Sequence, residues 1–186
     1  VHLCRDESQT MGTALQWVID HHKEHTITTV NLAPLDDQRH QEPLRTVIDE
    51  KLQKLRELDI WVSAPCGNNH YTDGISWPAC QRECFAIGGS VPGKHQAYLD
   101  RFSNTDLLVP AAATSSSNAY AAACSMILRE AIETSRFGWK PLGKNLPEAM
   151  MAIFQKTGRQ IEDPQTNLTF RELDLLAAVD FVMAGQ

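Results

Sequence analysis

Hydrophobic and polar residues follow two different periods along this chain. After Pro43, apolar residues recur every three or four positions and predict a helix that this proline opens; they are Leu44, Val47, Ile48, Leu52 and Leu55. A mostly apolar run at 60–64 follows directly and predicts a buried strand. The stretch 26–32 is rich in β-branched residues and predicts another strand. Because a helix joins these two strands, we expect them to be parallel.

The remaining segments continue the alternation of helices and strands. Residues 13–16 form a capping box that predicts a helix start at Thr13, and residues 84–91 predict a third strand. We expect residues 92–114 to be mostly loop and extended chain. Further helices are predicted from the serine-rich segment that follows to about residue 133, over 147–157 and over 170–182. This order is typical of the α/β class, with a mostly parallel sheet between two layers of helices. The length of 186 residues fits a single domain that spans 1–186.

Charge and hydropathy exclude two classes of partner. The chain is 42% hydrophobic and carries a formal net charge of −6, without a cluster of Lys and Arg residues. Nucleic-acid binding is therefore not expected, since the phosphate backbone requires a basic surface. No apolar run approaches the roughly 20 residues that span a bilayer, so no membrane partner is expected either. The sequence specifies no compartment.

Cysteine spacing gives no cofactor site. The chain has five cysteines, so at least one stays unpaired if disulfides form. Cys80 and Cys84 are near enough in sequence to form a bridge or to bind a metal, but no second Cys or His pair has zinc-finger spacing. We expect reduced, buried thiols at Cys66 and Cys124, which lie on apolar segments. No metal and no organic cofactor is predicted.

A hydroxyl-rich turn precedes an alanine-rich helical run at residues 113–123. Ser115 would lie at the start of this helix, where backbone N–H groups and the helix dipole stabilise a developing oxyanion. The same residue types are also ordinary helix N-caps. Ser115 is therefore a candidate nucleophile, with a capping role as the alternative.

A second candidate follows the buried strand at 60–64. The apolar run stops at Gly67-Asn68-Asn69, at the carboxyl end of the predicted strand. The side-chain amide of Asn68 would be a neutral donor suited to a tetrahedral oxyanion. A turn asparagine with positive φ is the alternative interpretation.

Several segments, in this order, resemble the C-terminal half of the subtilisin-like serine proteases. Residues 61–69 are similar to the strand that ends in Ala-Gly-Asn, and 75–79 (Ile-Ser-Trp-Pro-Ala) to the Ile-Ser-Tyr-Pro-Ala loop. Residues 102–110 resemble the segment Phe-Ser-Asn followed by Asp-Leu-x-Ala-Pro, and 113–123 the Gly-Thr-Ser-x-Ser-x-Pro motif. The resemblance implies a partial subtilisin-like fold, with Ser115 as nucleophile and Asn68 as oxyanion donor.

The chain also departs from the family pattern. Ala113 and Ala119 replace a glycine and a proline around the serine, and the connection from residue 110 to 114 is shorter than usual. Pro34 lies where the family pairs with a bound peptide, and it has no N–H to donate. The Asp-x-Gly and His-Gly-Thr motifs of the triad are absent. His70 is a candidate to replace the missing triad histidine as base, with a surface loop histidine as the alternative. His21, His22 and His25 lie at the end of a predicted helix, where histidines act as caps.

The sequence therefore predicts a serine hydrolase that cleaves peptide or ester bonds through Ser115 and Asn68. Two alternatives stay open: an inactive domain of the same fold that binds a peptide or protein partner, and a structural module in which Ser115 only caps a helix. On the resemblance, 1–186 is a truncated catalytic domain with an exposed sheet edge. We expect this edge to be covered by self-association or by a missing N-terminal half.

Overall fold

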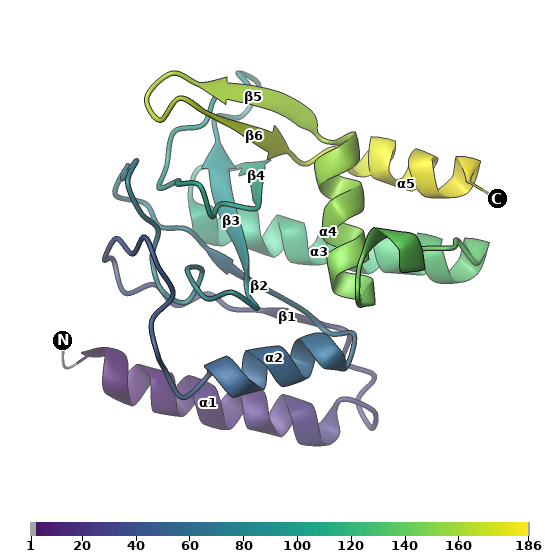
Figure 1. Ribbon diagram of the computed structural model, residues 1–186, viewed down its shortest axis with the longest axis horizontal. Coiled ribbons are helices and arrows are strands. Elements are labelled where there is room, and N and C mark those ends of the chain that lie inside the picture. The colour runs from purple at the N-terminus through teal and green to yellow at the C-terminus, as the bar shows by residue number, and fades with distance from the viewer. Residues whose placement is uncertain (1–2, 186) are drawn as a thin grey trace.

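Within residues 3–185, which a computed structural model describes, the chain forms a six-stranded sheet with helices on both faces (Figure 1). Side chains are described for residues 8–185. The strands are β1 (Thr29–Asn31), β2 (Trp61–Pro65), β3 (Phe85–Ser90), β4 (Leu107–Pro110), β5 (Arg159–Asp163) and β6 (Leu168–Glu172). The helices are α1 (Leu3–His21), α2 (Asp49–Glu57), α3 (Thr114–Ser135), α4 (Leu146–Thr157) and α5 (Leu175–Ala184), with a short 3-10 turn η1 (Lys140–Leu142).

The sheet is parallel except at one edge. Its strand order is β1-β2-β3-β4-β6-β5, and only the β5–β6 hairpin is antiparallel. α1 and α2 cover one face, where they pack with Val62 and Ala64 of β2. α3, α4 and α5 cover the other face, against Trp61 of β2 and Ile87 of β3. The predicted three-layer α/β architecture is confirmed.

The N-terminal helices differ from the prediction at their starts. Thr13 lies inside α1 rather than at its beginning, and its Oγ1 donates to the Gln9 carbonyl at 3.1 Å. The helix predicted to open at Pro43 begins only at Asp49. Gln81 explains the later start, because its Nε2 donates to the Leu44 carbonyl at 2.8 Å and to Asp49 Oδ1 at 2.5 Å. These bonds hold the preceding residues as a loop.

The C-terminal region was the least accurately predicted. Residues 107–110 form β4, which the prediction described only as extended chain. The helix predicted over 170–182 is wrong at its start, because Phe170 lies in β6 and α5 begins at Leu175. Asp174 sets that start by accepting a hydrogen bond from the Ala177 N–H at 3.0 Å. The hairpin was missed because its inward residues include a charged one, Glu172, which breaks the apolar alternation of a strand.

A buried ion pair joins the hairpin to the loop before β4. Arg101 donates to both carboxylate oxygens of Asp163, from Nε at 2.6 Å and from Nη2 at 3.0 Å. Burial by itself raises the pKa of the Asp163 carboxyl, but the Arg101 bonds outweigh it and the pKa lies below its ordinary value. Bidentate geometry of this kind fixes orientation as well as adding energy.

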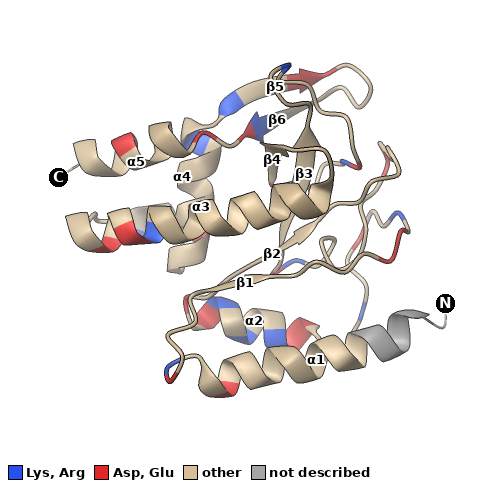
Figure 2. Ribbon diagram, turned by 180° about the vertical axis from the view of Figure 1, so that it is seen from behind, with Lys and Arg blue, Asp and Glu red and all other residues tan. Residues whose placement is uncertain are grey.

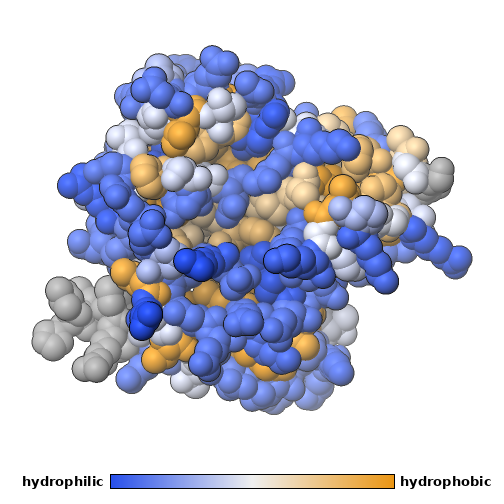
Figure 3. Space-filling model, viewed as in Figure 1, coloured by the Kyte–Doolittle hydropathy of each residue, from blue (hydrophilic) through white to orange (hydrophobic). Residues whose placement is uncertain are grey.

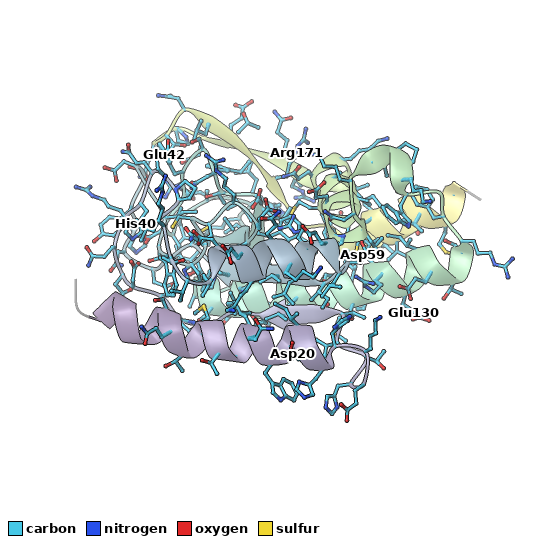
Figure 4. All side chains as sticks on the ribbon, turned by 60° about the horizontal axis from the view of Figure 1, so that its bottom comes forward. Asp20, His40, Glu42, Asp59, Glu130 and Arg171 are labelled. Atoms are coloured by element: carbon cyan, nitrogen blue, oxygen red, sulfur yellow. The ribbon has the colours of Figure 1, made fainter. Side chains whose placement is uncertain are left out.

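Connections between helices are also held by side chains. Asp59, labelled in Figure 4, lies between α2 and β2, and its Oδ1 accepts from the Leu146 N–H at the start of α4 at 2.8 Å.

Cys66, Cys80 and Cys84 are buried free thiols, and burial raises the pKa of Cys80 to about 12. Among the helices of the described residues, none combines the length and the apolar character needed to cross a bilayer.

Replacing Asp106 with asparagine tests the cost of a partly buried carboxylate. Burial raises the pKa of Asp106 to about 6, against an ordinary value of about 3.9, so the folded state holds this proton more strongly than the unfolded state. The contribution of Asp106 to stability is therefore lost as pH rises from about 4 through 6. Asp106→Asn, which can still accept from the Ala86 N–H, should raise the free energy of unfolding by up to about 3 kcal/mol at alkaline pH.

The measurement is urea unfolding of both proteins at about pH 4 and pH 8. The gain should appear at the higher pH and nearly vanish at the lower. Asp20→Asn on the exposed surface of α1 is the control and should show no such difference (Figure 4). An equal effect of Asp106→Asn at both pH values would contradict the assignment.

Candidate functional site

The two candidate residues lie at the carboxyl ends of neighbouring parallel strands. Asn68 follows β2, and Ser115 is the second residue of α3, which follows β4. Parallel strands end at the same edge of a sheet, and ligands of open α/β sheets bind there. Both residues are exposed.

Thr114 joins the two segments. Its backbone N–H donates to Asn68 Oδ1 at 2.8 Å, and its hydroxyl donates to the same oxygen at 3.1 Å. The hydroxyl also accepts from the Gly67 N–H at 3.1 Å. The residue immediately before Ser115 is thus bound directly to the Asn68 side chain, and Thr114 itself is fully buried.

These bonds set the orientation of the Asn68 amide. The carbonyl oxygen accepts two donors from Thr114, so the amide nitrogen Nδ2 must be the other end of the group. Among the described residues, no hydrogen bond from Asn68 Nδ2 is found, so Nδ2 stays available as a donor on an exposed residue. This is the chemical role that an oxyanion donor requires.

Ser115 does not cap its helix. The N-cap of α3 is Ala113, in extended conformation with φ −146° and ψ 150°, and it makes no side-chain capping bond. The capping interpretation of Ser115 is therefore wrong. Its hydroxyl lies in the first turn, where helix N–H groups have no partner within the helix and the positive end of the dipole is located.

Two side chains that the sequence analysis did not single out fix the start of α3. Asn118 Nδ2 donates to the Leu32 carbonyl at 2.7 Å and to the Ser63 carbonyl at 3.1 Å, and it also contacts Asn31. Ser117 Oγ donates to the Val109 carbonyl at 2.8 Å. These bonds of Asn118 and Ser117 hold the helix against β1, β2 and β4. They fix the helix start in a chain that has Ala119 where the family pattern has a proline.

The turn that carries Asn68 requires a glycine. Gly67 has φ +120°, and a Cβ at this position would lie 2.1 Å from Oδ2 of Asp100. Asp100 holds both ends of the turn: its N–H donates to the Gly67 carbonyl at 3.2 Å, and its Oδ1 accepts from the Tyr71 N–H at 2.9 Å. Burial raises the pKa of the Asp100 carboxyl, although the backbone bonds of the turn and the charge of His70 act against the shift.

The histidines occupy different surroundings. His21 and His22 bind carbonyls of Trp17 and Ile19 at the end of α1, as expected of helix-capping residues. His40, labelled in Figure 4, is partly buried and binds Asp36 at 2.7 Å. His70 lies in the same turn as Asn68, and its Nδ1 lies 2.5 Å from the Tyr98 carbonyl.

Other possible sites give no stronger candidate. Among the described side chains, no group of three or more His, Cys, Asp or Glu residues is arranged to hold a metal ion. A hollow of about 540 Å³ lies between residues 42–53 and 81–83, and none of the residues discussed as site candidates lines it. Among the described residues, the candidates at the ends of β2 and β4 therefore stay those that the sequence predicts.

Solved structures share this fold at low sequence identity. The self-cleaved protease domain of PatA has a TM-score of 0.68 at 14% identity, covering 90% of this chain and 66% of that one. The prenylagaramide maturation protease PagA has a TM-score of 0.66 at 14% identity, with coverage of 92% and 68%. The PatG macrocyclase in complex with peptide has a TM-score of 0.66 at 14% identity, with coverage of 94% and 56%.

No family model and no curated protein matches the sequence. The chain spans between about half and two thirds of the length of these three solved chains. At this level of identity the likeness concerns the fold. The chain therefore has the partial subtilisin-like fold that the ordered motifs predict.

Proposed function

We propose that this chain is a serine hydrolase that cleaves peptide or ester bonds, with Ser115 as nucleophile and Asn68 as oxyanion donor. The observation that carries the proposal is the pair of hydrogen bonds from Thr114 to Asn68 Oδ1. They hold the residue before Ser115 against the oxyanion donor and leave Asn68 Nδ2 at the exposed side. The fold shared with solved proteases supports the same reaction class.

In this mechanism the Ser115 hydroxyl attacks the substrate carbonyl and forms a tetrahedral intermediate. Asn68 Nδ2 donates to the oxyanion, and the first-turn N–H groups of α3 add a favourable dipole. The Oγ proton passes to a base as the Oγ–carbon bond forms, and collapse of the tetrahedral intermediate breaks the scissile bond and expels the leaving group. Water then attacks the acyl-serine, which releases the acid and returns a proton to Ser115 Oγ. An activated ester suits this site, since its leaving group departs without a proton.

An inactive domain that binds a peptide or protein partner is the alternative function. A solved chain that shares the fold, the PatG macrocyclase, is described in complex with a peptide, and this supports a peptide-binding role. Residual catalysis of about 10³–10⁴ over water survives loss of triad members when the oxyanion hole is intact. The two functions are therefore separated by measuring turnover of an activated ester.

A complementary chain segment is proposed to cover α3 and the free edge of β1. β1 ends the sheet on this side, and α3 packs against it. The exposed side of α3 carries Tyr120, Met126 and Ile127, whose exposed fractions are 58%, 55% and 52%. No charged residue occurs in α3 before Arg129 (Figure 2). A second copy of the chain is the occupant we propose, with a separate N-terminal half as the alternative.

Ser115→Ala should abolish hydrolysis of p-nitrophenyl acetate and labelling by a fluorophosphonate. The melting temperature should barely change, because the exposed hydroxyl makes no capping bond. Ser116→Ala is the matched control, since Ser116 is an exposed serine of the same turn, and it should retain both signals. Hydrolysis that persists in Ser115→Ala would contradict the assignment of the nucleophile.

Asn68→Ala should lower kcat for the ester by about 10²-fold or more. Because this change also removes the acceptor for Thr114, Asn68→Asp is measured beside it. Aspartate keeps the acceptor but removes the donor and adds a negative charge beside the oxyanion, so its kcat should fall at least as far. Asn69→Ala, at the exposed neighbour, should leave kcat unchanged. Normal turnover in Asn68→Asp would rule out the oxyanion role.

Light scattering across micromolar concentrations measures the proposed association. The wild-type chain should show a concentration-dependent dimer, and Tyr120→Glu with Ile127→Glu should shift it to a monomer, because two charges would be buried in the interface. Leu176→Glu is the control, because Leu176 is 70% exposed and lies on another helix, α5, beside the apolar surface that Figure 3 shows. A wild-type chain that is monomeric throughout this range argues against self-association.

A further inference from the structure

Three aromatic rings form a stack at the exposed end of α1. The ring of Trp17 stacks on those of His21 and His25, with centroid distances of 4.7 Å and 5.3 Å and interplanar angles of 17° and 22°. Trp17 is 49% exposed, and His25 is exposed beside it. Aromatic contacts of this kind have preferred geometries. The ring stack therefore positions two imidazoles although they lie on the surface.

The main chain also brings the two histidines together. The His25 N–H donates to the His21 carbonyl at 3.1 Å, which continues the helical bonding pattern beyond the last residue of α1. Residues four positions apart on a helix are neighbours on one face. Thr26, with φ +51°, departs from the helical conformation directly after His25. His25 is thus held beside His21 by the backbone as well as by Trp17.

The hydrogen bond of the His21 ring leaves one nitrogen free as a ligand. Nδ1 lies 2.8 Å from the Trp17 carbonyl oxygen, which only accepts hydrogen bonds. Nδ1 therefore carries the proton in the neutral ring, and Nε2 keeps its lone pair. Histidines that bind metals almost always donate their other ring N–H to an acceptor in this way. His21 is therefore already in the tautomer that a metal ligand requires.

The separation of the two imidazoles suits a single shared ion. The ring centroids of His21 and His25 are 6.2 Å apart, and the rings are inclined by 32°. With metal–nitrogen bonds of about 2.0–2.1 Å, two imidazoles on one ion have centroids roughly 4.5–6.4 Å apart, depending on the angle at the metal. The observed separation lies within this range. Among the described residues, no other two histidine rings are in contact.

Imidazole nitrogen selects the class of ion. Neutral imidazole suits Ni²⁺, Cu²⁺ and Zn²⁺, whereas Mg²⁺ and Ca²⁺ take oxygen ligands. Within the described side chains, no group of three or more His, Cys, Asp or Glu residues is arranged around an ion, so water would fill the remaining positions. Affinity for divalent ions rises from Ni²⁺ to Cu²⁺ and falls again at Zn²⁺.

The charge around the ring stack favours a cation. Asp20, labelled in Figure 4, precedes His21, and Glu24 precedes His25; both acidic residues are exposed. Lys23 is the one basic residue among Lys, Arg, Asp and Glu positions of the segment 17–26. Two carboxylates against one ammonium leave this segment negative, and opposite charges attract at short range.

The ring stack lies away from the candidate site. α1 runs to the end of the molecule at which β1 begins, and residues 22–28 connect the two (Figure 1). β1 and β2 are parallel, so the amino end of β1 is opposite the edge of the sheet that carries Asn68. A ligand of the ring stack is therefore a different ligand from the substrate of Ser115.

We propose that His21 and His25 bind one divalent transition-metal ion of the nickel, copper and zinc group. Each imidazole contributes one nitrogen, which in His21 is Nε2, and water completes the coordination. Trp17 supports the site in two ways, because its ring positions both imidazoles and its carbonyl sets the His21 tautomer. The site is independent of the proposed hydrolase function.

Isothermal titration calorimetry with Ni²⁺ tests the site. Ni²⁺ is the probe because the thiols of this chain also suit zinc. The wild-type chain should bind one ion, and His21→Gln and His25→Gln should each weaken binding by at least about 10-fold. Cu²⁺ should bind more tightly than Ni²⁺, and Mg²⁺ should not compete with it.

Two further histidines supply matched controls. The His22 ring also binds a helix carbonyl through Nδ1, that of Ile19 at 2.7 Å, but it is not part of the ring stack. His2 is another imidazole close to the start of the chain. His22→Gln and His2→Gln should keep the wild-type affinity. The melting temperature of His25→Gln should barely change, because no hydrogen bond holds the His25 ring among the described residues.

Tryptophan fluorescence locates the bound ion. Ni²⁺ beside Trp17 should quench part of the emission of the four tryptophans, since Trp61 and Trp77 are buried in the core. Trp17→Phe should lose this quenching but retain binding in the calorimeter, because phenylalanine keeps an aromatic face and the main-chain carbonyl of residue 17. Quenching that persists in Trp17→Phe would place the ion elsewhere.

The calorimetric outcomes are equally decisive. A wild-type chain without saturable Ni²⁺ binding overturns the site, as does wild-type affinity in His21→Gln and His25→Gln. An equal loss of affinity in His22→Gln or His2→Gln also overturns it, and competition by Mg²⁺ would show oxygen rather than imidazole ligands. Failure of the metal site leaves the proposed hydrolase function standing, since ester turnover and its loss in Ser115→Ala are measured without metal.

Discussion

The alignment of β2 with β4, fastened by Thr114 and Asn68, is the constraint on which the candidate site depends. Parallel pairing through β3 brings the ends of these strands to one edge of the sheet. The Thr114 bonds then fix the distance between the turn after β2 and the start of α3. Neither segment could hold a serine and an amide in one place alone, since each is a short connection exposed to solvent.

Much of this arrangement follows from local sequence patterns. The buried run at 60–64 and the polar residues after it indicated both the strand and the turn. The alanine-rich stretch after Ser115 indicated a helix, because alanine has the highest helix propensity. The order of short motifs then placed Asn68 and Ser115 on one edge, which periodicity by itself does not do.

What could not be predicted depends on contacts between distant residues. Asp100 and Asn118 are ordinary polar residues in the sequence, and their importance appears only when the fold brings them to Gly67 and to β1. The late start of α2 has the same origin, because Gln81 binds residues from a distant loop. The strand β6 was not predicted because its buried Glu172, whose partners are Ser90 at the end of β3 and His95 in the loop that follows, looks like a surface residue in the sequence.

The Arg101–Asp163 ion pair has a consequence for the order in which the chain acquires its site during synthesis. Arg101 follows Asp100, which holds the turn of Asn68. Among the described residues, the guanidinium of Arg101 pairs with the carboxylate of Asp163 in β5, far along the chain. A nascent chain that has emerged only through α3 contains Ser115, Asn68 and His70, but it lacks the anion that keeps Arg101 buried. The geometry of the candidate site is therefore completed only after the β5–β6 hairpin leaves the ribosome, and a chain that stops before this hairpin would carry the candidate residues without that geometry.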